Sequence, residues 1–214
     1  MIKTVFLFVL SLVLSTNLHA QDAKAKKLLN EVSAKVKSYD NMFIDFKYAL
    51  TNEEQGVNQE TRGDVTLMGE KYKLNLMGTT QIYDGQKLYT IVPEDEEITI
   101  STQNPEDDDA ITPSRMLTFF NKGYTYKWDI EQNVKGRMIQ YIKLIPMDSE
   151  SEIKEALLGV DPQTKHIYRL IMTQKNGTKI TITVNSFKTD QPMPGSLFVF
   201  EKSKYSDYYI NNLD

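Results

Sequence analysis

The chain has 214 residues, a formal net charge of −4 and no cysteine. The lack of cysteine excludes disulfides, thiol catalysis, cysteine metal sites and a lipid anchor on an N-terminal cysteine. Mild acidity with mixed signs argues against a nucleic-acid partner, because nucleic acid requires a basic face.

The N-terminal segment has the pattern of an export signal. Lys3 supplies a positive charge, residues 5–14 are apolar except for Ser11, and a short polar stretch leads to Ala20. This order is typical of a secretory signal peptide, and the apolar run is shorter than the about 20 residues of a membrane-spanning helix. We expect a signal peptide over residues 1–20 and one domain over residues 21–214. An uncleaved membrane anchor is the alternative.

A helix is predicted over residues 22–39, where Leu28, Leu29, Val32 and Val36 recur at the helical period. From Met42 onward apolar and polar residues alternate, which is typical of half-buried strands. Further strands follow at short spacing, and the last of them is expected over residues 197–200. Asp84-Gly85 and Asn176-Gly177 are strong hairpin signals.

One segment interrupts the strands. Thr112-Pro113 places a capping residue before a proline at the first helical position. Four apolar residues then cluster, and Gly123 follows where a helix should end. The pattern predicts an apolar helix of about three turns, which carries Met116, Leu117, Phe119 and Phe120.

The succession of strands with hairpin-length links indicates an antiparallel meander. A twisted sheet of this size tends to curl. One face should therefore be concave and apolar, and the two predicted helices should cover it.

No residue pattern points to catalysis or to a metal. His166 stands alone beside a turn and is expected to be a surface residue, because general-base chemistry needs a positioned partner and a pocket. Residues 106–109 are all acidic but lack the ligand spacing and glycine of a calcium loop. Neither a Gly-x-Ser-x-Gly elbow nor a Gly-rich phosphate loop occurs. We therefore expect no catalytic residue, no metal and no cofactor, which leaves binding as the leading class of function.

Aromatic and methionine side chains are the remaining feature. They fall on the predicted strands and on the short apolar helix, and an ordinary core accounts for most of them. Methionine adapts its shape to its neighbours. A curved sheet with a covering helix is also a recurrent design for an apolar pocket, so a hydrophobic cavity is the alternative to a filled core.

The serial order of several motifs resembles a known family. The motifs are Phe43-Ile44-Asp45-Phe46, Arg62-Gly63-Asp64-Val65, Ile82-Tyr83-Asp84-Gly85-Gln86-Lys87-Leu88-Tyr89, Thr112-Pro113-Ser114-Arg115-Met116-Leu117, Tyr141-Ile142-Lys143-Leu144-Ile145-Pro146 and the Asn176-Gly177 hairpin. In this order they resemble the periplasmic outer-membrane lipoprotein carriers, the LolA-like proteins. The resemblance covers nearly all of residues 21–214.

The resemblance implies a mainly β fold with helices, an incomplete antiparallel β-barrel of about eleven strands whose concave face the helices cover. It further implies a periplasmic chaperone, with no cofactor of its own, that takes the acyl chains of lipoproteins from an inner-membrane ABC-type release complex. The cargo then passes to the outer membrane, with or without a receptor there. Better-known carriers have an arginine in the turn after the Gly-Asp strand, where this chain has Met68-Gly69-Glu70. Arg115 on the short helix is a candidate substitute.

We therefore expect a monomeric carrier that is not an enzyme. A sensor or interaction module on the same scaffold is the main alternative, and a hydrolase of envelope lipids is a weaker one. Apolar side chains that alternate on strands or cluster on the short helix are expected to contact the acyl chains. They are Phe46, Tyr72, Leu74, Leu76, Met116, Phe119, Phe120 and Trp128.

Overall fold

The computed structural model describes residues 22–103 and 112–214. The expected signal peptide and the acidic segment over residues 106–109 lie outside these ranges. Within them, no helix is both long enough and apolar enough to cross a membrane.

A single sheet dominates the described part of the chain. It follows a helix that includes residues 22–37, here called the N-terminal helix. The strands are β1 (Met42–Asn52), β2 (Val57–Met68), β3 (Lys71–Leu76), β4 (Thr79–Tyr83), β5 (Lys87–Val92), β6 (Glu97–Thr102), β7 (Tyr124–Val134), β8 (Arg137–Pro146), β9 (Ile153–Val160), β10 (Ile167–Gln174), β11 (Lys179–Thr189) and β12 (Tyr209–Asn212). The helical turns are α2 (Pro113–Met116), η1 (Phe119–Asn121), η2 (Gly195–Phe198) and η3 (Lys202–Tyr205).

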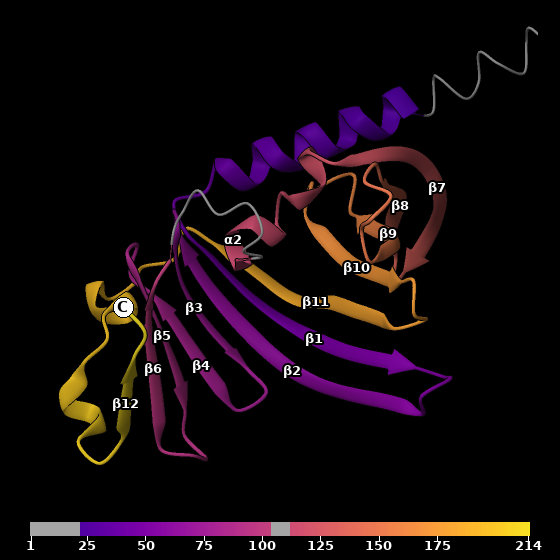
Figure 1. Cartoon of the computed structure of the whole chain (residues 1–214). Coiled ribbons are helices and arrows are strands. Elements are labelled where there is room, and N and C mark those ends of the chain that lie inside the picture. Colours follow the sequence, from indigo (N-terminus) through magenta and orange to yellow (C-terminus); the bar gives the residue numbers. More distant parts are fainter. Residues whose placement is uncertain (1–21, 104–111) are drawn as a thin grey trace, which may run out of the picture.

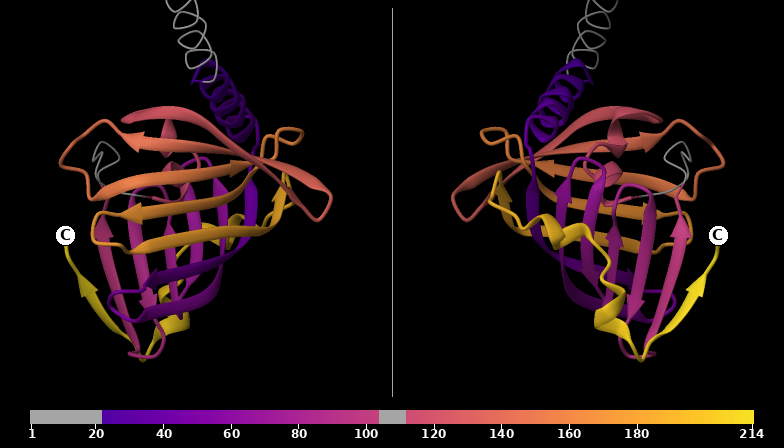
Figure 2. Two further views of the ribbon diagram at one scale, coloured as in Figure 1. Left: turned by 90° about the vertical axis from the view of Figure 1, so that its right-hand side faces the viewer. Right: turned by 90° about the vertical axis from the view of Figure 1, so that its left-hand side faces the viewer.

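The strand order is β12-β6-β5-β4-β3-β2-β1-β11-β10-β9-β8-β7. Most neighbours are consecutive in sequence because hairpins connect them, but β1 pairs with the distant β11. The sheet is strongly curved, and the strands from β7 to β11 run across those from β3 to β6 (Figure 2). Its two edges, β7 and β12, do not meet. The expected open, mainly β barrel is confirmed, with twelve strands in the described residues instead of about eleven.

Both helical covers lie on the concave side of the sheet. The N-terminal helix runs along the β7–β10 end, and α2 lies between that helix and the sheet (Figure 1). The apolar stripe of the N-terminal helix, which includes Leu28, Leu29 and Val32, packs into a cluster with Ile142, Leu144 and Leu158 from the sheet. A second cluster gathers around Ile44, Phe46 and Val65 on the other part of the concave face.

The C-terminal segment differs from the prediction. Residues 197–200 do not form a strand, because Leu197 and Val199 donate backbone hydrogen bonds to Pro194 and Ser196, which closes the 3-10 turn η2. The last strand is β12, and it runs parallel to β6. Tyr208 and Ile210 pack on a small third cluster of Ile82, Ile91 and Ile98.

The predicted three-turn helix is also shorter than expected. It consists of the four residues of α2 followed by the separate turn η1, and Thr118 between them leaves the helical conformation with φ −138° and ψ 8°. A continuous helix would bury only one stripe of this apolar run. The break instead allows Phe120 to become fully buried beneath the N-terminal helix, while α2 also reaches β2 and β3.

Candidate hydrophobic cavity

An apolar cavity of about 270 Å³ lies between α2 and the concave face of the sheet. Its walls come from β1 to β4 and β9 to β11, and its cover comes from α2 and the residue that follows it. The lining residues are Ile44, Phe46, Tyr48, Val65, Leu74, Leu76, Gln81, Pro113, Met116, Leu117, Leu158, Ile167, Leu170, Ile182, Val184 and Phe187.

The strand register arranges the walls in cross-strand rows. Ile44 of β1 stands between Phe187 of β11 and Val65 of β2, and Val65 is opposite Leu74 of β3. In the next row, Phe46 is opposite Val184. Side chains at alternate positions of a strand point to the same face, so the rows form one continuous apolar surface.

A third row completes the wall at the β9 end. Tyr48 of β1 is opposite Ile182 of β11, which is opposite Leu170 of β10, which in turn is opposite Leu158 of β9. The wall therefore spans both halves of the sheet, which are the strands from β12 to β1 and the strands from β11 to β7. Pairing between β1 and β11 is what joins the two halves.

The lack of a side chain at Gly63 leaves room for the Phe46 ring in the cavity wall. Gly63 lies on β2 directly opposite Phe46. A methyl group on Gly63 would come within 2.7 Å of Phe46 Cζ and 2.8 Å of the Asn75 carbonyl oxygen. Such distances are shorter than side chains tolerate, so the absence of a side chain at this position lets the Phe46 ring lie across β2.

The cover of the cavity is short, and we call it the lid (α2 with Leu117). Thr112 caps it by accepting a hydrogen bond of 3.3 Å from the Arg115 backbone N–H. Pro113, Met116 and Leu117 close the cavity with apolar atoms. The Ser114 hydroxyl is buried and has no hydrogen-bond partner among the described residues, and an unpaired hydroxyl contributes nothing to holding the lid in place.

The part of the lining that the structure describes is almost purely apolar. Gln81 and the Tyr48 hydroxyl provide its polar side-chain atoms, and none of the described lining residues is charged. Next to it, burial raises the pKa of Tyr72 to about 12, with a further contribution from Tyr83, so this phenol stays neutral. Such a lining favours an apolar ligand held by burial over a ligand held by ion pairs.

Only some of the residues that we expected to contact a ligand line the cavity. Phe46, Leu74, Leu76 and Met116 line the cavity. Tyr72 belongs to the same cluster as Phe46 but is buried beside Tyr83, outside the cavity lining. Phe119, Phe120 and Trp128 instead pack in the cluster beneath the N-terminal helix.

Several lining residues were not foreseen. Ile44 and Tyr48 share the alternation that singled out Phe46, so the sequence contained a signal for them. The β11 residues Ile182, Val184 and Phe187 depend on pairing between β1 and β11, which no local pattern reveals.

His166, which we expected at the surface, is partly exposed and makes specific contacts. Its Nε2 lies 2.7 Å from the Tyr39 hydroxyl, and its ring stacks on Phe187 with the ring centres 4.2 Å apart. Burial lowers the pKa of His166, the nearby Lys35 lowers it further, and Asp161 opposes both effects. His166 thus joins the end of the N-terminal helix to a wall residue of the cavity.

The described residues contain no group of three or more histidines or acids that could hold a metal ion. The site itself has apolar walls beneath a short cover, which suit burial of a hydrophobic group.

The sequence is similar to one known protein family. Residues 34–201 match the family model described as outer membrane lipoprotein carrier protein LolA. No curated protein matches the sequence.

Several solved structures align with the chain at low sequence identity. An uncharacterized conserved protein from Thermus thermophilus aligns with a TM-score of 0.55 and 10% identity, covering 88% of this chain and 99% of that one. A LolA superfamily protein from Nitrosomonas europaea aligns with a TM-score of 0.44 and 12% identity, over 82% and 97% of the two chains. The MucA/MucB complex of Pseudomonas aeruginosa aligns with a TM-score of 0.45 and 14% identity, covering 84% of this chain and 62% of that one.

Proposed function

Because the chain belongs to the outer membrane lipoprotein carrier family LolA, we propose that it is a periplasmic carrier for the acyl chains of lipoproteins. In this proposal residues 1–20 direct export, and the cavity receives acyl chains at an inner-membrane ABC-type release complex. The carrier then delivers its cargo to the outer membrane, with or without a receptor there.

The observation that carries the proposal is the apolar cavity beneath the lid. Each methylene of an acyl chain contributes about 0.8 kcal/mol when it is buried. Cargo with several chains therefore needs a shielded apolar surface during transit. Binding through burial alone requires neither a nucleotide nor a metal on the carrier.

The size of the cavity adds a requirement for movement. Its volume of about 270 Å³ is below the roughly 300–1,000 Å³ of typical small-ligand sites. The lid must therefore move outward before whole acyl chains can enter. Met116 and Leu117 line the cavity from the lid, and we propose that their apolar contacts contribute to its closure.

A direct test measures binding of a fluorescent triacylated lipopeptide to the purified protein. We expect saturable binding that Met116→Glu weakens at least about tenfold, because a charge on the lid would have to be buried against the chains. The matched control is Met147→Glu, because Met147 is 69% exposed and lies outside the cavity. It should leave binding unchanged.

Failure of the folded protein to bind the lipopeptide would overturn the proposal. Equal binding by the two glutamate variants would also overturn it, because the cavity would then not be the site. Retrieval of a transmembrane regulator by the protein, without lipopeptide binding, would support the alternative of a sensor or interaction module.

A further inference from the structure

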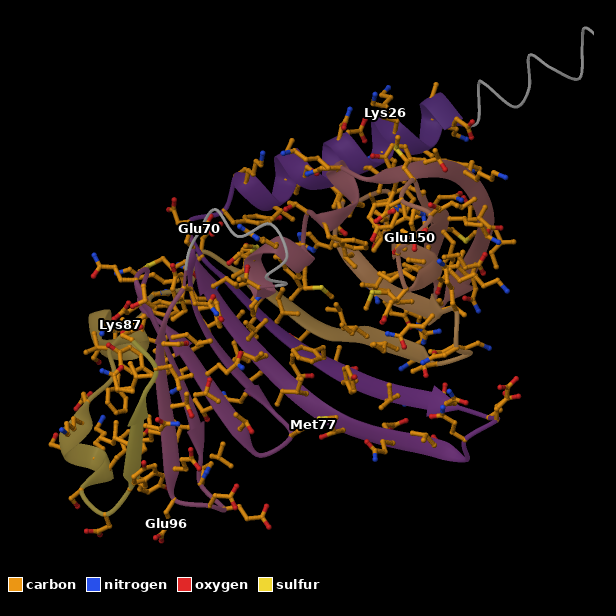
Figure 3. All side chains as sticks on the ribbon, in the orientation of Figure 1. Lys26, Glu70, Met77, Lys87, Glu96 and Glu150 are labelled. Atoms are coloured by element: carbon orange, nitrogen blue, oxygen red, sulfur yellow. The ribbon has the colours of Figure 1, made fainter. Side chains whose placement is uncertain are left out.

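The N-terminal helix carries a concentration of positive charge on an otherwise acidic chain. Its five lysines, Lys24, Lys26, Lys27, Lys35 and Lys37, are all exposed. Residues 94–97, which lead from β5 into β6, are all acidic. In Figure 3, Lys26 and Glu96 lie at opposite ends of the molecule.

Few acids oppose these lysines. Within the described residues of the helix, the acids are Asp22 and Glu31. Glu31 Oε2 lies 2.7 Å from Lys165 Nζ, so the positive charge of Lys165 offsets the negative charge of Glu31. Asp40 follows beyond the helix. The exposed face of the helix is therefore basic over its first two turns and its last turn.

Packing of the helix fixes where the lysines lie. Ala25, Leu28, Leu29 and Val32 are buried against the sheet, so the lysines occupy the flanks and the outer side. Lys24 Nζ lies 4.2 Å from the centre of the Trp128 ring. The ammonium group of Lys24 thus makes a cation–π contact with the ring, and the residue as a whole stays exposed.

The composition of this outer face distinguishes between two kinds of partner. Protein interfaces are enriched in arginine and aromatic residues and depleted of lysine, whereas the helix has five lysines and no arginine. At about 1.5 Å per residue, Lys24 and Lys37 are about 20 Å apart along the helix axis. A dispersed row of lysines without an apolar pocket complements an extended anionic surface, such as a layer of acidic lipid headgroups.

We propose that the outer face of the N-terminal helix docks the protein on membranes that contain anionic lipids. No large apolar side chain lies on this face, since Ala23, Asn30, Ala34 and Ser38 separate the lysines there. The contact is therefore electrostatic and reversible, without insertion into the hydrocarbon. Reversibility suits a protein that must leave the membrane again.

Docking on this face leaves the helix, about 10–12 Å across, between the lipid surface and the lid beneath it. Ser33 on the helix donates a hydrogen bond of 2.8 Å to Asn121, next to the lid, and Met116 and Leu117 pack against the cluster that the helix covers. A role for docking in the loading or unloading of acyl chains rests on the proposed carrier function. Docking itself does not rest on it, so the docking proposal and the proposed function can fail separately.

Co-sedimentation with vesicles tests the docking. The exported protein is mixed with phosphatidylcholine vesicles that contain or lack phosphatidylglycerol. We compare Lys24→Gln/Lys26→Gln/Lys27→Gln with a control of equal charge change, Lys154→Gln/Lys188→Gln/Lys202→Gln, whose lysines are exposed elsewhere. The helix variant should lose at least about tenfold in affinity for the anionic vesicles. The control should change less than about twofold, and added salt should weaken binding of the wild-type protein.

Four results would overturn the docking proposal: no binding to anionic vesicles, equal binding to neutral vesicles, an equal loss in the two triple variants, or stronger binding to polyglutamate than to anionic vesicles. The last result would assign the face to an acidic protein partner. Fatty-acid binding is measured on the same samples. If docking fails while all three proteins still bind the fatty acid, the proposed function remains.

Discussion

The two ends of the concave face are built from similar side chains but are filled differently. Beneath the N-terminal helix, Phe120, Ile142 and Leu144 have no exposed surface. Beneath the lid, Tyr48, Leu74, Leu76 and Val184 are only half-buried and surround a cavity. Hydrophobicity of the sheet is therefore not what distinguishes a core from a binding site here.

The covers account for the difference. The N-terminal helix is helical over residues 22–37 and inserts a full apolar stripe, whereas α2 has four residues and ends at Met116. A short cover contributes fewer apolar contacts, so it leaves space and can move at lower cost. The packed end should therefore determine stability, and the cavity end should determine binding.

Phe120→Ala should produce the largest loss of stability. Phe120 is fully buried, and removal of such a ring costs about 3–5 kcal/mol through lost burial and the cavity left behind. Urea unfolding monitored by circular dichroism measures the change. Met116→Ala at the lid should cost less than half as much while weakening acyl binding. Equal losses of stability would contradict the contrast between the two ends.

Gly63→Ala should be the next most harmful change. The new methyl group would meet Phe46 Cζ and the Asn75 carbonyl oxygen, and overpacking of this kind costs about 1–3 kcal/mol. Because Phe46 lines the cavity, affinity for a fluorescent fatty acid should fall as well. Gly195→Ala is the control, since no atom lies within 4 Å of the added methyl group there. A neutral Gly63→Ala would refute the packing described for Phe46.

A leucine-to-phenylalanine exchange can be made at both ends. Leu74→Phe extends into the cavity and should change the free energy of unfolding by no more than about 1 kcal/mol, in the stabilising direction, while reducing ligand binding. Leu144→Phe enters the filled end, where Leu144 is fully buried, and should destabilise by about 1–3 kcal/mol. Thermal unfolding and fatty-acid titration distinguish them. Similar behaviour of the two variants would show that the cavity is not accessible space.

The smallest effect concerns His166. Burial lowers the pKa of its imidazole below the usual 6.5, so the unfolded chain binds a proton more readily than the folded one. Stability should therefore decrease as the pH falls below about 6.5 towards the folded-state pKa. Urea midpoints measured from about pH 7 to pH 5 should show this slope. His166→Gln should reduce it, and an unchanged slope would assign it to other groups.

The sequence predicts the architecture well because the fold is built from local hairpins. Alternation identifies which face of β1 and β3 is apolar, and Asp84-Gly85 and Asn176-Gly177 mark turns that the structure contains between β4 and β5 and between β10 and β11. The pairing of β1 with β11 joins segments distant in sequence, such as Ile44 and Phe187, and no local pattern encodes it. The β11 side of the cavity was missed for that reason.

The apolar segment after Pro113 shows a second limit. Its residues predict burial but not the partner against which each is buried. Phe119 and Phe120 lie close to Met116 in sequence, yet the break at Thr118 directs them to the packed end. Their place follows from competition between the N-terminal helix and the lid for the concave face, which is a property of the whole fold.

Photolabelling with a diazirine-bearing fatty acid tests the central claim most directly. After irradiation, mass spectrometry identifies the labelled residues in the folded protein. If acyl chains bind beneath the lid, we expect labels on the cavity wall and lid, at Leu74, Met116, Val184 or Phe187. These labels should be lost in Leu74→Phe. Labels confined to exposed apolar residues such as Ile130 or Met147, or an equal yield from Leu74→Phe, would contradict the central claim.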